Sequence, residues 1–321
     1  GAVGNVLCIK TFFRLGISDG VNLSLLSLAA SDLFYLISAL INTISFMLHS
    51  AEELSLYTVW FPVDPEAIFL VFASTGSSFY AISMLVTTFI TVVRCLAVVQ
   101  PLKYRNLISR QTTAIIISIF TLVSITSAIL VVALAGIPPP IDSNSNTTRP
   151  TLLFFPERVL MKDIIYGTRD IILPLASQII VGLCVVIMAR YLRKASIFRH
   201  KHSRNTAMNT QKSISMIGNL VRRNVKTVTD PESAKVVGKE LQVVQQMLLI
   251  AVVYSLCNMP KVVFNMTLIS VPDFYSGGRY SAVYFTSNII RELIQSVNAS
   301  VDIFIYWKYN SKFRSHFIRP K

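Results

Sequence analysis

The chain has few charged residues. Only 14% of its 321 residues are Asp, Glu, Lys or Arg, whereas 53% are hydrophobic. A soluble globular domain has about 25% charged and about 45–50% apolar residues, and a disordered chain is less apolar still. The composition therefore excludes an ordinary soluble domain and a disordered protein. It favours a chain whose side chains face lipid.

Residue types that bind metals or catalyse reactions are also scarce. The four cysteines all fall in or beside apolar stretches and lack metal-ligand spacing: Cys8, Cys95, Cys184 and Cys257. The four histidines fall in predicted loops or tails: His49, His200, His202 and His316. We therefore expect apolar packing for the cysteines and no disulfide framework. No nucleophile–base pair is placed for catalysis, so we expect neither an enzyme nor a bound cofactor.

No signal peptide with a basic start and a small-residue cleavage site precedes the first apolar run. The sequence begins at Gly1 rather than Met, and apolar residues follow at once. We therefore expect residues 1–14 to be the end of a first span that begins upstream.

Long apolar segments dominate the rest of the chain. A membrane helix needs roughly 20 mostly apolar residues, and continuous apolar runs exclude the alternating pattern of a β-barrel. The sequence predicts one all-α membrane domain over residues 1–321, a seven-helix bundle. Its predicted helices are residues 1–14, 22–48, 64–97, 110–136, 166–194, 237–270 and 281–307.

Basic residues concentrate in alternate connections. Most of the 30 Lys and Arg residues fall beside one set of helix ends, above all in the polar loop 195–236 and the C-terminal tail. The positive-inside rule places these segments, and hence the C-terminus, in the cytoplasm, and the N-terminus outside. Asn146-Thr147-Thr148 is a glycosylation sequon in a predicted outside loop. The net charge of +14 is explained by topology and lipid contact, so no nucleic-acid partner is expected.

Two aspartates fall within predicted spans. Asp32 and Asp302 are accompanied at similar depth by Asn5, Ser83 and Asn298. An ionisable residue within a membrane is costly, about 2.5–3.5 kcal/mol on insertion scales. Carboxylate, hydroxyl and amide oxygens suit a small hard cation or a shared proton. The alternative is a hydrogen-bonded packing cluster without an ion.

Three further residues stand out within or at the ends of spans. Arg94 ends a predicted helix, where composition alone favours a simple interface anchor. Pro174 and Pro260 interrupt two spans, and proline frees a carbonyl and bends a helix. Each bend is either a hinge or a static kink.

Several motifs follow one another along the chain. They are Gly4-Asn5, Asn22-x-x-Leu25-x-x-Leu28-Ala29-x-x-Asp32-Leu33, Arg94-Cys95 with Pro101-Leu102, Pro174, Cys257-Asn-Met-Pro260, Asp302-Ile-Phe-Ile-Tyr306 and Tyr306-x-x-x-Asn310-x-x-Phe313-Arg314. Their order and spacing resemble those of a rhodopsin-like (class A) G-protein-coupled receptor over essentially the whole chain. The last motif resembles the turn into an amphipathic eighth helix on the membrane surface, here 309–318.

The resemblance implies a receptor in the plasma membrane that binds an extracellular ligand and activates a heterotrimeric G protein. It makes Arg94 the arginine that meets the G protein, with Glu240 as its resting-state ionic partner. It makes Tyr306, Pro260 and Pro174 switch residues. It also implies an allosteric sodium ion, held by Asp32, Ser83, Asn298 and Asp302.

The chain departs from the family at several positions. Val93 replaces the acidic residue normally before the arginine, so we expect raised basal activity or heavier reliance on Glu240. Phe69 stands where a disulfide cysteine is usual, and Ala299 removes one hydroxyl from the sodium pocket. We therefore expect a divergent branch, of an invertebrate, molluscan chemosensory or neuropeptide type.

The resemblance places the ligand between the outer halves of the helices. We expect the charged residues of those halves to line its pocket. The ligand-pocket candidates are Lys261, Glu292, Arg291, Arg169, Asp170 and Tyr80. No aspartate occurs near Gly76, which disfavours a biogenic amine and favours another polar small molecule or a peptide. Adjacent helical residues do not face each other, so we expect neither Arg169–Asp170 nor Arg291–Glu292 to be a simple mutual pair.

A transporter is the alternative function. Asp32 and Asp302 could then relay protons for a small-solute or proton-coupled carrier. The absence of an internal repeat argues against it.

Overall fold

The computed structural model describes most of the chain. The described residues are 1–17, 19–55, 58, 61–100, 109–136, 153–154, 156–191, 193, 231–275 and 277–318. Of residues 153–154, 156–159, 162, 231–244, 247, 311–312 and 318, only the backbone is described. Two expectations, the glycosylation of Asn146 and most of the cytoplasmic loop 195–236, lie outside the described residues.

The described chain is almost entirely helical. Its α-helices are α1 (Ala2–Leu15), α2 (Gly20–Leu54), α3 (Pro65–Val99), α5 (Arg110–Leu134), α6 (Pro156–Tyr166), α8 (Pro231–Ser270), α9 (Ser281–Tyr309) and α10 (Ser311–Ile318). A π-helical turn, η1 (Gly167–Ile172), follows α6 and leads into helical residues 173–191. Two strands of two residues each, β1 (Ala135–Gly136) and β2 (Leu153–Phe154), pair antiparallel.

Within the described residues, five helical segments are long and apolar enough to cross a membrane. They are Gly20–Leu54, Pro65–Val99, Arg110–Leu134, Asp163–Tyr191 and Leu248–Ser270. The prediction of apolar membrane-type helices is therefore confirmed, but five segments meet this criterion where seven were predicted. The other two are α1, whose 14 residues extend only about 21 Å at 1.5 Å per residue, and α9, which carries several charged side chains.

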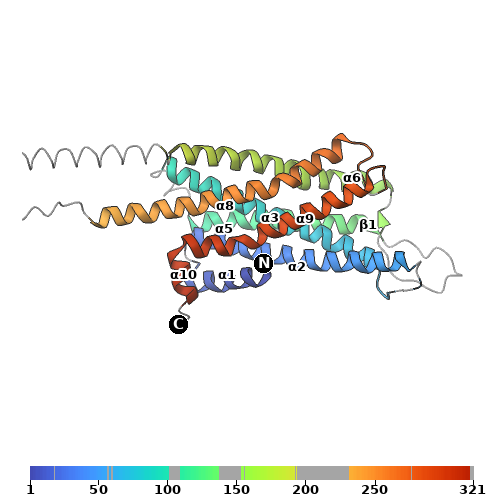
Figure 1. Ribbon diagram of the computed structural model, residues 1–321, viewed down its shortest axis with the longest axis horizontal. Helices are drawn as coiled ribbons and strands as arrows, with labels where there is room; N and C mark the ends of the chain where they lie inside the picture. The colour runs from blue at the N-terminus through green and yellow to red at the C-terminus, as the bar shows by residue number, and fades with distance from the viewer. Residues whose placement is uncertain are drawn as a thin grey trace, which may run out of the picture.

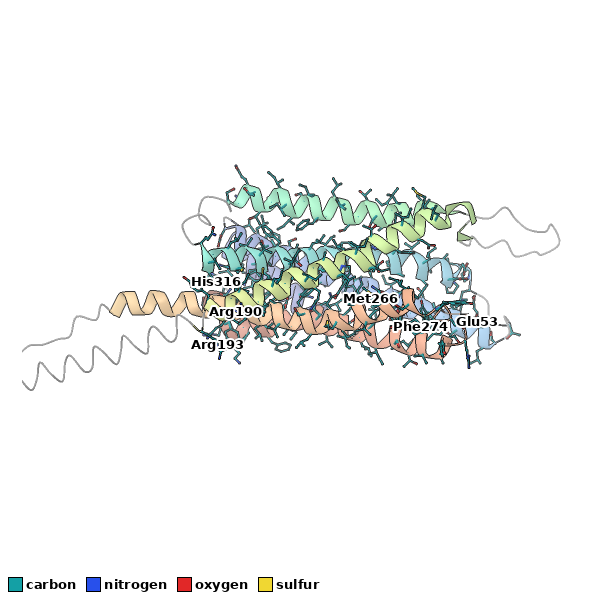
Figure 2. All side chains as sticks on the ribbon, turned by 90° about the horizontal axis from the view of Figure 1, so that it is seen from above. Glu53, Arg190, Arg193, Met266, Phe274 and His316 are labelled. Atoms are coloured by element: carbon teal, nitrogen blue, oxygen red, sulfur yellow. The ribbon has the colours of Figure 1, made fainter. Side chains whose placement is uncertain are left out.

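The helices lie side by side along the long axis of the molecule, and α10 turns across that axis at one end (Figure 1). The packing of α2 against α3 is the most extensive between any two described elements. Figure 2 shows Arg190, Arg193 and His316 at one end of the bundle and Glu53 and Phe274 at the opposite end. The labelled basic side chains are thus gathered at one end, as the sequence predicts for the cytoplasmic side.

Side-chain caps fix where three of the spans begin. The Asp19 carboxylate accepts a hydrogen bond from the Val21 amide at 3.3 Å, and the Asp64 carboxylate accepts one from the Glu66 amide at 3.1 Å. The Ser109 hydroxyl accepts one from the Thr112 amide at 3.1 Å. Such caps satisfy amides that have no partner within the helix. The starts of α2 and α5 lie at one end of the bundle, and the start of α3 lies at the other end.

Many small polar side chains are buried inside the bundle. Ser24, Ser31, Ser38, Ser78 and Thr87 are buried between helices. Large apolar side chains face outward instead, as Leu122, Val123 and Ile129 of α5 do. Small hydroxyl residues let helices approach closely where lipid supplies no hydrophobic driving force between them. This inside-out pattern is typical of a helix bundle surrounded by lipid.

Some predicted helix ends were wrong. The prediction ended the second helix at residue 48, but α2 continues to Leu54, where buried Glu52 accepts a hydrogen bond from the Phe61 amide at 3.0 Å. The fifth predicted helix, 166–194, is preceded by α6 and contains the π-helical turn η1. Helical residues beyond the apolar run carry no hydropathy signal, which is why they were missed.

Candidate functional site

A cavity of about 70 Å³ opens between four helices near the end of the bundle that carries Phe274. Helices α2, α3, α8 and α9 all contribute to its wall. The lining residues are Tyr35, Ala39, Asn42, Phe72, Ala73, Gly76, Ser77, Tyr80, Lys261, Arg291, Glu292 and Gln295. Four of the six predicted ligand-pocket residues therefore meet here: Lys261, Arg291, Glu292 and Tyr80.

Lys261 is the most deeply buried charge of this site, with 1% of its surface exposed. Its ammonium lies 3.1 Å from a carboxylate oxygen of Asp170 and 4.8 Å from the centre of the Tyr80 ring. A buried ammonium is costly unless it is paired, and an aromatic face adds a further attraction. Asp170 thus stabilises the cavity wall by holding the charge of Lys261.

The remaining predicted pair, Arg169 and Asp170, supports the cavity from behind. The guanidinium of Arg169 donates to one oxygen of Asp170 at 3.0 and 3.2 Å. Its third nitrogen donates to the Ser78 hydroxyl at 3.2 Å and to the Ser74 carbonyl at 3.4 Å, both in α3. The two neighbours form an ion pair, but not a simple mutual one, because Asp170 also holds Lys261 and Arg169 also donates to α3. They lie in the wider π-helical turn η1, and the long arginine side chain reaches back over its neighbour.

Asp170 also contacts α8 through its backbone. The side-chain amide of Asn265 in α8 donates to the Asp170 carbonyl. Pro174, which has no amide hydrogen, follows directly on this π-helical turn, where the Leu173 amide donates to the Thr168 carbonyl five residues earlier. Asp170 therefore joins this part of the chain to α8 through both its backbone and its side chain.

Arg291 and Glu292 form the charged part of the wall contributed by α9. Their nearest charged atoms are 3.5 Å apart, so these neighbours also interact. Arg291 donates more closely to the Asn288 amide oxygen, at 2.6 Å, and lies 5.2 Å from the Phe264 ring centre. Both side chains retain some exposure, 17% and 33%. The pair is therefore accessible from the cavity rather than sealed in the core.

Three polar atoms at the cavity lack a hydrogen-bond partner among the described residues. They are the amide oxygen of Asn42, the amide nitrogen of Gln295 and the Nε of Arg291. All three are buried atoms of residues that line the cavity. Buried polar groups are nearly always hydrogen-bonded, so these atoms mark where a polar molecule would be held.

A second polar cluster lies deeper, between α2, α3 and α9. The Ser83 hydroxyl donates to the carboxylate of Asp32 at 2.6 Å, and the Tyr306 hydroxyl lies 3.4 Å from the carboxylate of Asp302. The two carboxylates are near enough to interact electrostatically. The Asn5 amide donates to the backbone carbonyl of Ala299 at 2.8 Å rather than to either aspartate.

The predicted sodium site matches this cluster only in part. Asp32, Ser83 and Asp302 supply the oxygen donors that a hard cation takes. Asn298 is half-buried and makes no side-chain hydrogen bond within the described part of the chain. No group of three or more His, Cys, Asp or Glu side chains among the described residues could hold a metal ion. The fit to sodium therefore rests on two carboxylates and a hydroxyl.

Hydrogen bonds between hydroxyl and amide groups connect the cavity to the middle of the bundle. The Tyr80 hydroxyl donates to the Asn258 amide oxygen at 3.2 Å, and Asn258 donates to the Gln178 amide oxygen at 3.4 Å. One helical turn further, the Ser177 hydroxyl bonds to the Tyr254 hydroxyl at 2.9 Å and to the Thr88 hydroxyl. These contacts join α3, the helix 173–191 and α8 at two levels.

The opposite end of the bundle holds Arg94. This residue is half-buried in the last turns of α3 and lines a small cavity with Val93 and residues of α2 and α5. Glu240 lies in α8, but its side chain is not among those described, so the predicted pairing of Arg94 with Glu240 stays a prediction. Tyr306 is held by aromatic contacts, with its ring centre 5.3 Å from that of Phe12 and 5.8 Å from that of Phe313.

Sequence reasoning missed several residues of the cavity and of the contacts below it. Asn42, Gln295 and Asn265 carry no charge and belong to no motif of the resemblance, and Asn258 stood out only as part of Cys257-Asn-Met-Pro260. A usable signal was present for two of them, because Gln295 and Asn265 each follow a charged residue by four positions and so share its helix face. Asn42 has no such neighbour in the sequence.

No model of a protein family matches the chain, and a search of curated proteins gives no match.

Proposed function

We propose that the chain is a G-protein-coupled receptor of the rhodopsin-like type, a seven-helix membrane protein that binds an extracellular ligand and activates a heterotrimeric G protein. The observation that carries the proposal is the order and spacing of its motif residues from Gly4-Asn5 to Phe313-Arg314. The hydrogen bond between Asp32 of α2 and Ser83 of α3, two residues that the resemblance groups together, supports it.

In this proposal, α1 and α9 are spans in addition to the five apolar segments. Both pack against α2, and α9 also packs against α8. The charges of α9 face the cavity and the aspartate cluster, which is how a span can carry Arg291, Glu292 and Asp302. The short amphipathic helix α10 then lies along the cytoplasmic surface of the plasma membrane, at the end that carries Arg190 and Arg193.

The contacts of α8 suggest how a ligand would act. Lys261, Asn258 and Tyr254 are three and four residues apart, so they share one face of α8. Lys261 lines the cavity, Asn258 bonds to Tyr80, and Tyr254 bonds to Ser177. A ligand that changes the pairing of Lys261 would therefore shift α8 between two packing arrangements and move its cytoplasmic end. The receptor itself performs no chemistry, and the G protein hydrolyses GTP.

The experiment that tests the proposal is GTP exchange on purified heterotrimeric G proteins added to membranes that contain the chain. We expect exchange above that of empty membranes, because Val93 removes the acidic neighbour that would restrain Arg94. Exchange equal to that of empty membranes, both alone and with polar extracts as ligand, would contradict the proposal.

The buried pair Asp32 and Asp302 favours a second candidate, a proton-coupled carrier of small solutes. Two carboxylates on neighbouring helices, each bonded to a hydroxyl, could pass a proton between them. Solute uptake into vesicles that depends on a proton gradient, and its loss in Asp302→Asn, would support the carrier. We favour the receptor because its motifs cover the whole chain.

A further inference from the structure

We infer that the cavity between α2, α3, α8 and α9 binds a small carboxylate that also carries a hydrogen-bond donor, as an α-amino acid or a hydroxy acid does. The inference rests on the proposed receptor function, since it names the ligand class of that receptor's cavity. Three observations lead to it: the charge of the wall, its unpartnered polar atoms and its volume.

Positive charge exceeds negative charge at this site. Among the described side chains that line the cavity, the cations are Lys261 and Arg291 and the carboxylate is Glu292. Behind this wall, Asp170 pairs with Lys261 and also with a further cation, Arg169. Asp170 alone serves two cations. An uncompensated charge away from water is costly. An anionic group bound in the cavity would remove that cost, so the wall is complementary to an anion.

The unpartnered donors show where the anionic group would lie. The Nε of Arg291 and the amide nitrogen of Gln295 are both buried and unpartnered among the described residues. They are four residues apart on α9 and therefore share a face. The amide oxygen of Gln295 faces the Tyr35 hydroxyl at 3.5 Å, which assigns its nitrogen as the free donor. Two donors on one face match the two oxygens of a carboxylate.

The unpartnered acceptor requires a donor on the same ligand. The amide oxygen of Asn42 on α2 is buried and has no partner in the described structure, and Asn42 is only 6% exposed. Glu292 lines the same cavity and presents a second acceptor. A carboxylate alone would leave the Asn42 oxygen unpaired, at a cost of about 1–3 kcal/mol. An ammonium or hydroxyl on the ligand would satisfy it.

The volume restricts the ligand to a small molecule. At roughly 10–15 Å³ for each water, a cavity of about 70 Å³ has room for about five waters or for a similar number of non-hydrogen atoms. Small α-amino acids and hydroxy acids fit this size.

The test is binding of radiolabelled L-alanine to membranes that contain the full chain, with unlabelled competitors. Lactate keeps the carboxylate and a donor, propionate keeps only the carboxylate, and ethylamine keeps only the ammonium. We expect L-alanine and lactate to compete, propionate to compete at least about tenfold more weakly, and ethylamine not to compete. The loss of one hydrogen bond to a charged group lowers the affinity by about this factor.

Variants of α9 locate the binding. Arg291→Gln and Gln295→Leu should each weaken L-alanine binding at least about tenfold. Thr286→Ala is the matched control, because Thr286 is exposed on the same helix and its hydroxyl bonds only to the Ala282 carbonyl. The comparison of competitors needs no substitution, so it holds even where a variant fails to fold.

Three results would overturn the inference: ethylamine competing as well as L-alanine, L-alanine binding unchanged in both Arg291→Gln and Gln295→Leu, or no binding of any probe. Nucleotide exchange measured in the same membranes separates the two proposals. Exchange without probe binding overturns the ligand class alone. Probe binding without exchange supports the ligand class and overturns the receptor function.

Discussion

The ammonium of Lys261 and the carboxylate of Asp170 lie 3.1 Å apart and join α8 to the π-helical turn η1. The pair is unequal, because Lys261 has one carboxylate partner whereas Asp170 holds both Lys261 and Arg169. Removing the carboxylate of Asp170 leaves two buried cations, Lys261 and Arg169, without this partner. Removing the ammonium of Lys261 leaves no cation without its partner. The same residue, Asp170, also receives the Asn265 amide on its backbone carbonyl. It is therefore the point through which the helix with Pro174 is attached to α8.

Asp170→Asn should destabilise the chain much more than Lys261→Met. Leaving buried charges without a partner costs about 3–5 kcal/mol, whereas Lys261→Met leaves the pair of Asp170 with Arg169 intact. The midpoint of thermal unfolding of the purified chain in detergent measures this. The double variant Asp170→Asn/Lys261→Met should be more stable than Asp170→Asn alone. Equal losses from the two single variants would contradict this account.

Tyr254→Phe should lower the free energy of unfolding by about 0.5–1.5 kcal/mol, the net contribution of one hydrogen bond. The lost bond is the one at 2.9 Å between the hydroxyls of Tyr254 and Ser177. Ser177→Ala should cost more, because it also removes the contact with the Thr88 hydroxyl. The double variant should cost less than the sum of the two single variants, because both remove the contact between Tyr254 and Ser177. Tyr191→Phe serves as the control, since Tyr191 is exposed. Strictly additive losses would show that the two hydroxyls do not depend on each other.

Sodium should stabilise the wild type if the Asp32 cluster binds it. A ligand that binds only the folded state raises its stability, so the unfolding midpoint should rise when sodium replaces choline at constant ionic strength. Asp32→Asn should abolish that rise, and Ser83→Ala should reduce it. Asp19→Asn, which alters only an exposed helix cap, should respond as the wild type does. If the unfolding midpoint of Asp32→Asn rose with sodium as much as that of the wild type, the Asp32 cluster would be a packing cluster that holds no ion.

The predicted orientation can be tested with two glycosylation sequons, Asn146-Thr147-Thr148 and a second match to the pattern, Asn22-Leu23-Ser24. Asn146→Gln should remove a glycan from the chain made in a glycosylating cell, seen as a faster-running band, because the loop with Asn146 is predicted outside. Asn22→Gln should change nothing, since Asn22 lies at the predicted cytoplasmic start of α2, where its amide donates to the Gly16 carbonyl. A glycan on Asn22 would indicate the reverse orientation. The absence of a glycan on Asn146 would contradict the predicted orientation.

The apolar runs predict most of the helices because a lipid-facing span has a continuous apolar sequence. The predicted helix 110–136 is α5, Arg110–Leu134, with only its last two residues in β1. The same reasoning cannot find polar helical turns beyond the apolar run, as at the end of α2 and in α6. It also cannot find η1, because nothing in hydropathy distinguishes a π-helical turn from an α-helical one.

The site was predictable only where a charge or a family motif marked a residue. Lys261, Arg291 and Glu292 were identified by their charge, and the structure places them around one cavity. Asp32 and Ser83 were grouped by the resemblance alone, and the structure joins them at 2.6 Å. Asn42 and Gln295 were missed because they carry no charge and belong to no motif of the resemblance. Their convergence depends on how α2 and α9 are rotated about their axes, which composition does not determine.

In the proposed receptor, the chain activates G proteins through Arg94, and Val93 loosens the resting state. Ligand-free GTP exchange on added heterotrimeric G proteins should be measured for the wild type, Arg94→Ala, Val93→Asp and Val93→Asn, each at equal expression in membranes. Val93→Asn separates the effect of a charge beside the arginine from that of a polar side chain at a position that is 6% exposed.

We predict exchange by the wild type, its loss in Arg94→Ala, and exchange in Val93→Asp that is lower than in Val93→Asn, because only the aspartate can restrain the arginine electrostatically. Exchange that is unchanged in Arg94→Ala, or absent from the wild type altogether, would contradict the account.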